Sequence, residues 1–277
     1  VWKFLIEYLE GNFRKYSNNL TGTLKGSTPN NYKKAIQLLF NLIAKNYGDE
    51  NTKIVGIKEV WGIEFIPFLI KNLRNTKIIV IIRDPRAVFA SKQNTNTQYP
   101  IYFICNQWRK IFALAHYYKN KFDGKVFILK YEELIFNPEK IINQICDFLG
   151  LNFYTDLLNL KRLKDGNNKN WSQNSNFKSR KRGFDRDAID RWSKYILKRE
   201  KKIIEYLCYH EMKRFGYEVN EIDKKSLNSD YLTERQINYE NSRHDFISQS
   251  NKLNDEIKTK KFFLKKYIYK YLRNEVI

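Results

Sequence analysis

The chain has 277 residues, of which 42% are hydrophobic and 16% aromatic, enough to build one large domain with an extension or two small domains. Its formal net charge of +21 favours an anionic partner: a nucleotide, a nucleic acid, an acidic lipid or an acidic glycan. No apolar run reaches the ~18 residues of a membrane span and no signal peptide is recognisable, so we expect a cytoplasmic protein, at most peripheral to a membrane.

The amino-terminal part alternates between helical and strand-like patterns. Residues 32–47 carry apolar side chains at helical spacing, and Ile54–Ile57 predicts a short buried strand that ends at Lys58. A second helical pattern covers residues 65–73. This succession indicates helices and strands that follow one another along the chain.

The clearest strand is Lys77–Ile82, a continuous β-branched run that is typical of a parallel strand buried on both faces. It stops at Arg83-Asp84-Pro85, and a helix is expected to begin near Arg86. The elements expected downstream are a helix over 101–121, a strand over 125–131, a helix over 138–150, and helices at about 186–197 and 199–214. Strands that alternate with helices predict an α/β fold, with a parallel sheet flanked by helices.

Three polar residues follow predicted strands. Lys58, Arg83 and Tyr131 each stand at the end of a different one. Since ligands of such sheets bind at the carboxyl ends of the strands, these residues form a candidate site.

The remaining segments are more polar. A strongly basic loop is expected over residues 161–183, and the chain is weakly patterned from about residue 220 to the basic-aromatic stretch 260–267. We therefore predict a domain over 1–219 and a helical or partly disordered extension over 220–277. The basic stretch could contact anionic lipid weakly.

Cysteines and histidines give no pattern of a metal site. The cysteines are far apart and odd in number, which predicts reduced thiols, and the histidines are isolated and expected to be structural: Cys105, Cys146, Cys208, His116, His210 and His244. We therefore expect no bound metal.

The strongest local signal is the turn after the clearest strand. The strand delivers Arg83 to the edge of the sheet, where a guanidinium can hold a phosphate through two parallel hydrogen bonds. Ser91 lies on the first turns of the next helix, whose amino-terminal dipole also favours an anion. An alternative for the same residues is an Arg-Asp turn that caps the helix.

This turn resembles the 3′-phosphate motif of sulfotransferases that use 3′-phosphoadenosine 5′-phosphosulfate (PAPS), in which a strand is followed by Arg and, eight residues later, by Ser. The resemblance implies a sulfotransferase fold related to that of P-loop NTPases, with Arg83 and Ser91 on the 3′-phosphate. Arg86 matches the "RDPRA" variant of the carbohydrate and tyrosylprotein branch.

Further segments follow in the family's order. Ile57-Lys58-Glu59 resembles the strand end whose Lys sits beside the transferred sulfonate. Lys130-Tyr131-Glu132-Glu133-Leu134, together with Phe148-Leu149-Gly150-Leu151, resembles the "YEdL…FLGL" stretch whose Tyr contacts adenine. The resemblance therefore implies roles for Lys58 and Tyr131.

Two segments of the basic loop also resemble the family. Ser175-Asn176-Phe177 resembles the segment that cradles the adenosine, which implies roles for Ser175 and Phe177. Arg182-Gly183 stands where relatives place a basic residue on the 3′-phosphate.

The family's first phosphate loop, of the type Pro-Lys/Arg-Ser-Gly-Thr-Thr, is not recognisable. Lys25–Pro29 has similar letters, but no hydrophobic strand precedes it. We therefore expect the sulfotransferase domain to be incomplete at its amino terminus and the chain to be inactive alone.

The resemblance implies transfer of a sulfuryl group from PAPS to a hydroxyl acceptor without a metal, and a carbohydrate is the expected acceptor. In that chemistry Lys58 would stabilise the leaving phosphate, and Glu59 is a weak candidate for the general base. Two alternatives stay open: a nucleotide kinase or NTPase of related fold, for which no complete Walker A pattern is found, and a basic nucleic-acid-binding protein. Because the motifs concentrate at one site, we expect no nucleic acid as partner.

Overall fold

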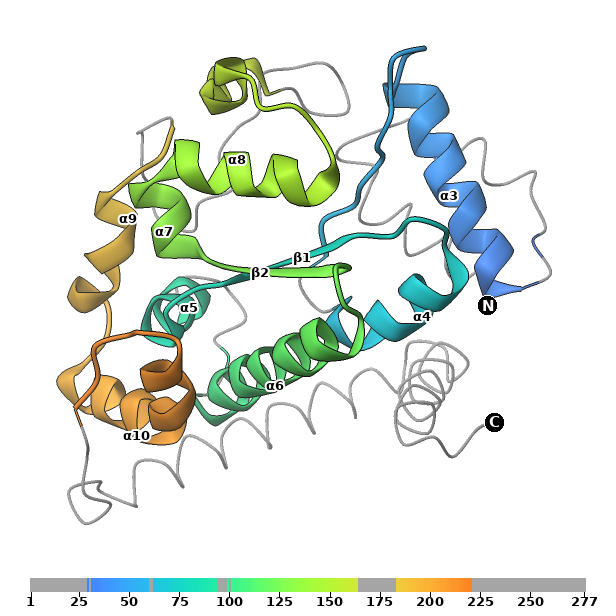
Figure 1. The fold of residues 1–277 in the computed structure, drawn as a ribbon. Coiled ribbons are helices and arrows are strands. Elements are labelled where there is room, and N and C mark those ends of the chain that lie inside the picture. The colour runs from blue at the N-terminus through green and yellow to red at the C-terminus, as the bar shows by residue number, and fades with distance from the viewer. Residues whose placement is uncertain are drawn as a thin grey trace, which may run out of the picture. The chain divides into compact units, whose positions relative to one another are not determined.

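A computed structural model describes residues 29, 31–59, 62–93, 99, 101–163 and 183–220 (Figure 1). The strands are β1 (Ile78–Ile82) and β2 (Val126–Lys130). The α-helices are α3 (Tyr32–Tyr47), α4 (Ile66–Asn72), α5 (Pro85–Gln93), α6 (Ile101–Lys121), α7 (Tyr131–Phe136), α8 (Pro138–Leu149), α9 (Asp187–Asp190) and α10 (Lys198–Arg214). Short 3-10 helices are η1 (Gly62–Phe65), η2 (Thr155–Leu158), η3 (Leu160–Arg162) and η4 (Arg191–Lys194).

The described residues fall into two structural units, which are considered separately. The first unit contains α3, η1, α4, α8, η2 and η3. The second contains nearly all of β1 together with α5, α6, β2, α7, α9, η4 and α10. The candidate site is built within the second unit.

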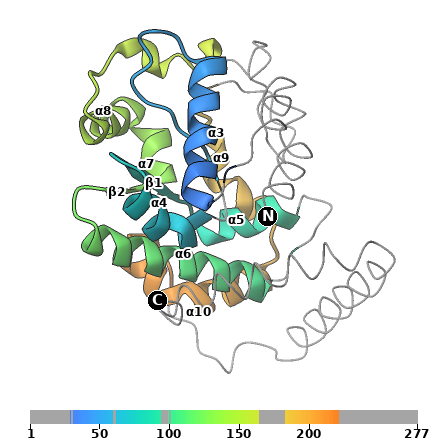
Figure 2. The same ribbon diagram turned by 90° about the vertical axis from the view of Figure 1, so that its right-hand side faces the viewer.

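The second unit is organised around the parallel pair β1 and β2, so the predicted α/β class and parallel pairing are confirmed. Helix α6 packs on β2, and α10 packs on both α6 and α5 (Figures 1 and 2). A helix follows the carboxyl end of each strand: α5 begins at Pro85, separated from β1 by two residues, and α7 begins at Tyr131, immediately after β2. The two strand-to-helix turns therefore lie at the same edge of the sheet.

Strand β1 differs from its prediction in one respect. Val80 and Ile82 are buried, whereas Ile81 between them is 53% exposed. Burial on both faces is therefore wrong at Ile81, because successive side chains of a strand point to opposite faces and only one of these faces is covered at that position. The exposed Ile81 shows that this part of β1 has a one-sided core.

The core of the second unit is built on the long helix α6. Its buried residues recur at helical spacing along one face: Ile101, Ile104, Cys105, Trp108, Phe112, Ala115 and Tyr118. Helix α10 packs its own buried residues against this face, including Ile203, Ile204, Cys208 and Met212. Cys105, Cys146 and Cys208 are all free thiols in buried positions, as the sequence predicted.

The first unit contains the helices predicted over 32–47 and 138–150. Asn31 caps α3, since its side-chain oxygen accepts a hydrogen bond of 2.9 Å from the Lys34 amide. The strand predicted at Ile54–Ile57 is wrong: residues 52–59 are irregular, and Ile54 and Ile57 are 46% and 49% exposed. The apolar residues of this segment are not sufficient to form a strand, because the backbone groups of a strand must also pair with a neighbouring strand.

Several predicted segments lie outside the described residues. These are the amino-terminal residues 1–28, most of the basic loop over 161–183, and the extension from residue 221 onward. Within the described part of the chain, no helix combines the length and the apolar character that crossing a membrane requires.

Candidate functional site

The candidate site begins where β1 turns into α5. Asp84 caps the helix, because its Oδ1 accepts a hydrogen bond of 2.8 Å from the Arg86 amide and its carbonyl accepts one of 3.0 Å from the Val88 amide. Pro85 takes the first helical position, where proline is favoured because a backbone N–H there would have no acceptor within the helix. The capping alternative considered for this turn is therefore correct for Asp84, and it leaves Arg83 for another role.

Arg83 follows the last residue of β1 and is held from two sides. Its NH2 donates to the Ala188 carbonyl at 2.8 Å, and its guanidinium carbon lies 4.6 Å from the centre of the Tyr131 ring. Its own carbonyl accepts a hydrogen bond of 2.8 Å from the indole of Trp108. The side chain is thus fixed in direction by α9 at its tip and by α7 on its face, and α6 holds its backbone carbonyl.

The Arg83 guanidinium is incompletely satisfied. Its Nε is buried and has no hydrogen-bond partner among the described residues. No carboxylate of the described part of the chain forms an ion pair with it. A buried donor on a fixed cation that pairs with no carboxylate of the described residues is suited to bind an anion.

Arg86 lies one residue beyond Pro85 and has the opposite surroundings. Its NH2 pairs with Asp84 at 2.6 Å, and its NH1 pairs with Glu205 of α10 at 2.5 Å. Its NH1 also donates to the Glu218 carbonyl at 3.2 Å, and its guanidinium carbon lies 4.4 Å from the Trp192 ring centre. Burial alone would lower the pKa of Arg86, but the hydrogen bonds and charges of Asp84 and Glu205 raise it. Arg86 therefore serves the scaffold of the turn.

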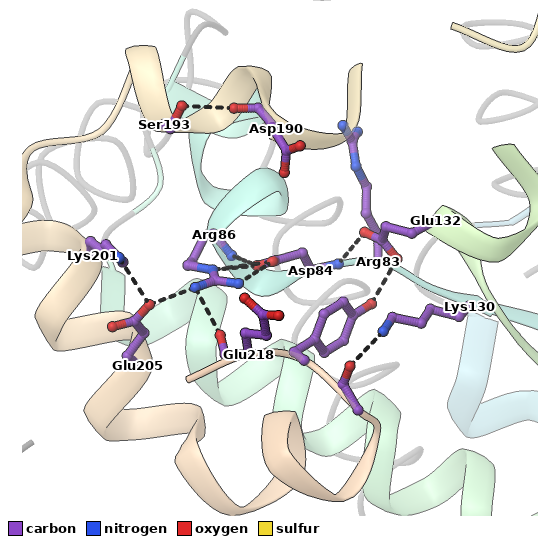
Figure 3. Close-up of polar contacts among 12 residues, drawn as sticks. Arg83, Asp84, Arg86, Lys130, Glu132, Asp190, Ser193, Lys201, Glu205 and Glu218 are labelled. Carbon is purple, nitrogen blue, oxygen red and sulfur yellow. Dashed lines mark hydrogen bonds and ion pairs between the residues drawn. The ribbon is translucent and has the colours of Figure 1, made fainter. Parts of the chain in front are cut away.

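A second carboxylate secures the turn from the side of β2. Glu132 accepts a hydrogen bond of 3.0 Å from the Asp84 amide through Oε1, and one of 2.9 Å from the Tyr217 hydroxyl through Oε2. Lys130, two residues earlier, donates to the Gly216 carbonyl at 2.9 Å and lies 4.0 Å from the Tyr217 ring centre (Figure 3). Burial and the Glu132 carboxylate raise the pKa of the Tyr217 phenol, so Tyr217 remains a donor.

The structure brings together two of the predicted site residues, Arg83 and Tyr131, in direct contact. Ser91 is the seventh residue of the nine-residue α5 in the same unit and is half-buried. Gly183 has a φ of +114°, a conformation that favours glycine, and it belongs to the first unit. Ser175, Phe177 and Arg182 lie outside the described residues.

Lys58 and Glu59 belong to the first unit. Both are exposed and lie in the irregular segment 52–59 rather than at the end of a strand. Their catalytic roles therefore stay predictions. In the described part of the chain, no group of three or more His, Cys, Asp or Glu side chains is placed to hold a metal ion.

Of the groups around Arg83 and its backbone, sequence reasoning singled out Tyr131 but gave no role at this turn to Glu132, Tyr217 or Ala188. Glu132 and Tyr217 lie 85 residues apart in sequence, and Arg83 and Ala188 lie 105 apart. One local signal was present: an acidic residue directly after the strand-end Tyr131, at a position that the structure buries. The contacts of the two distant residues could not be predicted from the sequence, because they depend on how α9 and α10 pack.

Comparison with known proteins adds an independent line of support. Residues 14–156, slightly more than half of the chain, match the family model described as "Sulfotransferase family". A solved structure, "Sulfotransferase Domain from the Curacin Biosynthetic Pathway", is similar with a TM-score of 0.52 and 16% identity, over 68% of this chain and 69% of that one. At that identity the likeness supports the fold alone. No curated protein matches the chain.

Proposed function

Because this chain belongs to the sulfotransferase family, we propose that it transfers a sulfuryl group from PAPS to the hydroxyl group of a carbohydrate. Family and fold support sulfuryl transfer in general. PAPS as donor and a carbohydrate as acceptor are our proposal. The observation that carries the donor is Arg83, a positioned guanidinium with a buried Nε that has no acceptor among the described residues.

A 3′-phosphate suits Arg83 better than a carboxylate of the protein would. A phosphate offers oxygens to Nε and to a terminal nitrogen at once, which gives two parallel charge-assisted hydrogen bonds. One terminal nitrogen is already committed to Ala188, and this contact fixes the plane of the guanidinium. Tyr131, whose ring lies against the same guanidinium, provides an aromatic surface for a base beside the phosphate.

The chemistry is an in-line displacement at sulfur. A bond forms from the acceptor oxygen to sulfur while the bond from sulfur to the 5′-phosphate oxygen breaks, and that oxygen keeps the electron pair. The acceptor proton passes to a base. We propose Lys58 as the cation that stabilises the leaving phosphate, and Glu59 as a candidate for the base.

The acceptor class rests on two features of the sequence. Arg83-Asp84-Pro85-Arg86 resembles the turn of the carbohydrate and tyrosylprotein branch. The net charge of +21 suits an acidic glycan. A transfer assay of the full-length enzyme with radiolabelled PAPS, on a panel of neutral glycans, sulfated glycans and tyrosine peptides, tests this choice. Labelling of the peptides but of no glycan would contradict it.

Calorimetry with three nucleotides tests the donor site. We expect 3′-phosphoadenosine 5′-phosphate to bind more tightly than ADP or ATP, because only the first carries a phosphate for Arg83. Equal affinity for ADP would reject the assignment. Preference for ATP would instead favour the nucleotide kinase or NTPase alternative, and tight, salt-dependent binding of oligonucleotides would favour the nucleic-acid-binding alternative.

The role of Lys58 is tested by its kinetics. In the full-length enzyme, replacing Lys58 with Ala should lower kcat by about 100- to 1,000-fold while nucleotide affinity changes little, because the contact strengthens in the transition state. Lys53→Ala is the matched control, since Lys53 is exposed in the irregular stretch that leads to Lys58. Unchanged kcat with lost nucleotide binding would make Lys58 a nucleotide anchor instead.

A further inference from the structure

Glu132 combines burial with an unusual set of partners. Glu132 is only 8% exposed, yet it forms no salt bridge with a described Lys or Arg. Its two oxygens accept from a backbone amide and a phenol instead. Burying a carboxylate that has no paired cation costs free energy, and the two hydrogen bonds of Glu132 must offset this cost.

The partners of Glu132 join three segments at the anion site. The dipeptide Tyr131-Glu132 touches the dipeptide Arg83-Asp84 twice: the Tyr131 ring lies on the guanidinium, and the Glu132 carboxylate accepts from the Asp84 amide. Tyr217, from the segment after α10, completes the arrangement by donating to the other oxygen. The peptide that links Arg83 to Asp84 is therefore fixed from the first turn of α7, which follows the neighbouring strand β2.

We propose that Glu132 is a positioning residue that sets the direction of Arg83 toward the 3′-phosphate, and that Tyr217 acts with it. The inference rests on the proposed function, since it concerns the same nucleotide site. Neither residue needs to touch the nucleotide. Each acts through the Arg83–Asp84 peptide: without the carboxylate, the Asp84 amide loses its acceptor and the turn can rotate.

A positioning role for Glu132 can be distinguished from a general contribution to stability by its effect on nucleotide selectivity. A support for the whole fold would affect every nucleotide alike, whereas a support for Arg83 affects the 3′-phosphate alone. The informative quantity is the ratio of two dissociation constants, that of adenosine 5′-phosphate divided by that of 3′-phosphoadenosine 5′-phosphate. These two nucleotides differ only in the group that Arg83 is proposed to hold.

The experiment measures this ratio by calorimetry in the full chain and in four variants. Glu132→Ala should weaken binding of 3′-phosphoadenosine 5′-phosphate by about 10- to 100-fold, a loss typical of displaced binding groups, with adenosine 5′-phosphate within about three-fold. Tyr217→Phe removes one of the two hydrogen bonds and should lower the ratio by about three- to ten-fold. Glu132→Gln should stay within about three-fold of the unaltered chain, because its amide can still accept from Asp84 and donate to Tyr217.

Glu133→Gln is the matched control. Glu133 neighbours Glu132 on α7 but is exposed, so its ratio should not change. Thermal unfolding of each variant identifies any that fails to fold. If Glu132→Ala does not fold, the ratios of Tyr217→Phe and Glu132→Gln decide the matter.

The outcomes separate the two proposals. If the unaltered chain binds both nucleotides equally, the proposed function fails and this inference fails with it. If the unaltered chain prefers the 3′-phosphate but Glu132→Ala and Tyr217→Phe keep the same ratio, the function stands and the positioning role is wrong. A loss in Glu132→Gln as large as that in Glu132→Ala would also overturn it, because the charge and not the hydrogen-bond geometry would then be what matters.

Discussion

Arg83 and Arg86 stand at the same strand-to-helix turn, three residues apart, but their surroundings differ in nearly every respect. Arg86 has two carboxylates, a carbonyl and an indole ring around it. Arg83 has one carbonyl and one phenol ring, and its Nε has no partner among the described residues. The protein completes the coordination of one guanidinium and leaves the other incomplete.

The difference indicates what leaves an arginine available to bind an anion. A guanidinium that already holds a carboxylate must give it up before it can hold a phosphate, whereas one held by a carbonyl and an aromatic ring keeps its charge available. Asp84, between the two arginines, is directed to Arg86 and to the helix end. Arg86 thereby occupies the carboxylate that would otherwise compete for Arg83.

The largest effect is expected from Arg86→Met. It leaves Asp84 buried without an ion-pair partner in the described part of the chain, and leaves Glu205 with only the longer contact to the half-exposed Lys201 at 3.7 Å, so it should lower the free energy of unfolding by about 3–5 kcal/mol. Urea unfolding measures the change. Arg162→Met is the control, because Arg162 and its partner Asp156 are 65% and 71% exposed and the pair should contribute less than about 1 kcal/mol. A loss at Arg86 no greater than at Arg162 would remove the distinction between scaffold and binding arginine.

Arg83→Met should show the reverse pattern. Its loss removes one hydrogen bond and one cation–π contact, and also removes a buried Nε that has no acceptor among the described residues, so the free energy of unfolding should change by less than about 1.5 kcal/mol. The affinity for 3′-phosphoadenosine 5′-phosphate should fall by about 2–4 kcal/mol, because a bidentate charged contact is lost. Calorimetry and urea unfolding on the same preparation measure both quantities. A large loss of stability with unchanged affinity would exchange the roles of the two arginines.

The two arginines also show how far the sequence alone could lead. Strong patterns predicted the bounds of β1, β2, α6, α8 and α10 closely, because a long apolar stripe at helical spacing favours a helix and a short β-branched run favours a strand. Strand-end positions predicted that Lys58, Arg83 and Tyr131 share one edge of the sheet; Arg83 and Tyr131 do lie in contact there, whereas Lys58 lies in an irregular segment. The strand at Ile54–Ile57 failed, since pairing depends on a partner that a local pattern does not contain.

The division of labour between Arg83 and Arg86 was beyond the sequence for a similar reason. Glu205 is 119 residues from Arg86, and nothing near either residue indicates that they meet. The ion pair follows from the packing of α10 against α5. Local chemistry predicted that the turn binds an anion, but which arginine is available for one depends on that distant carboxylate.

Asp84 offers a sharper test, because it serves the helix end and Arg86 at once. Asp84→Asn keeps the acceptor for the Arg86 amide but places an amide donor against the guanidinium, and should lower the free energy of unfolding by about 1.5–3 kcal/mol. Asp84→Ala also loses the cap and should cost about 1 kcal/mol more. Urea unfolding of the pair separates the two roles. Equal losses in the two variants would show that the cap contributes nothing.

The smallest effect concerns pH and the support of Arg83. Burial and the Glu132 carboxylate raise the pKa of Tyr217 in the folded chain, whereas an unfolded tyrosine titrates near pH 10, at about its ordinary value. The contribution of Tyr217 to stability is therefore fully present below about pH 10 and is lost as the pH rises further, because the unfolded chain then releases a proton that the folded chain retains.

The slope from this one proton approaches about 1.4 kcal/mol per pH unit, so the part of the loss that belongs to Tyr217 should reach about 1 kcal/mol near pH 10.5. Urea unfolding of the unaltered chain and of Tyr217→Phe, from neutral pH to about pH 11, measures it, because the variant has no phenol to titrate and its stability should fall less steeply. Tyr154→Phe is the control, since Tyr154 is 62% exposed and the substitution removes the same hydroxyl from the surface. Parallel curves for Tyr217→Phe and the unaltered chain would mean that the Tyr217 phenol ionises as readily in the folded chain as in the unfolded one. The buried hydrogen bond to Glu132 would then not hold under these conditions, and the support of Arg83 would have to come from Tyr131 and Ala188 alone.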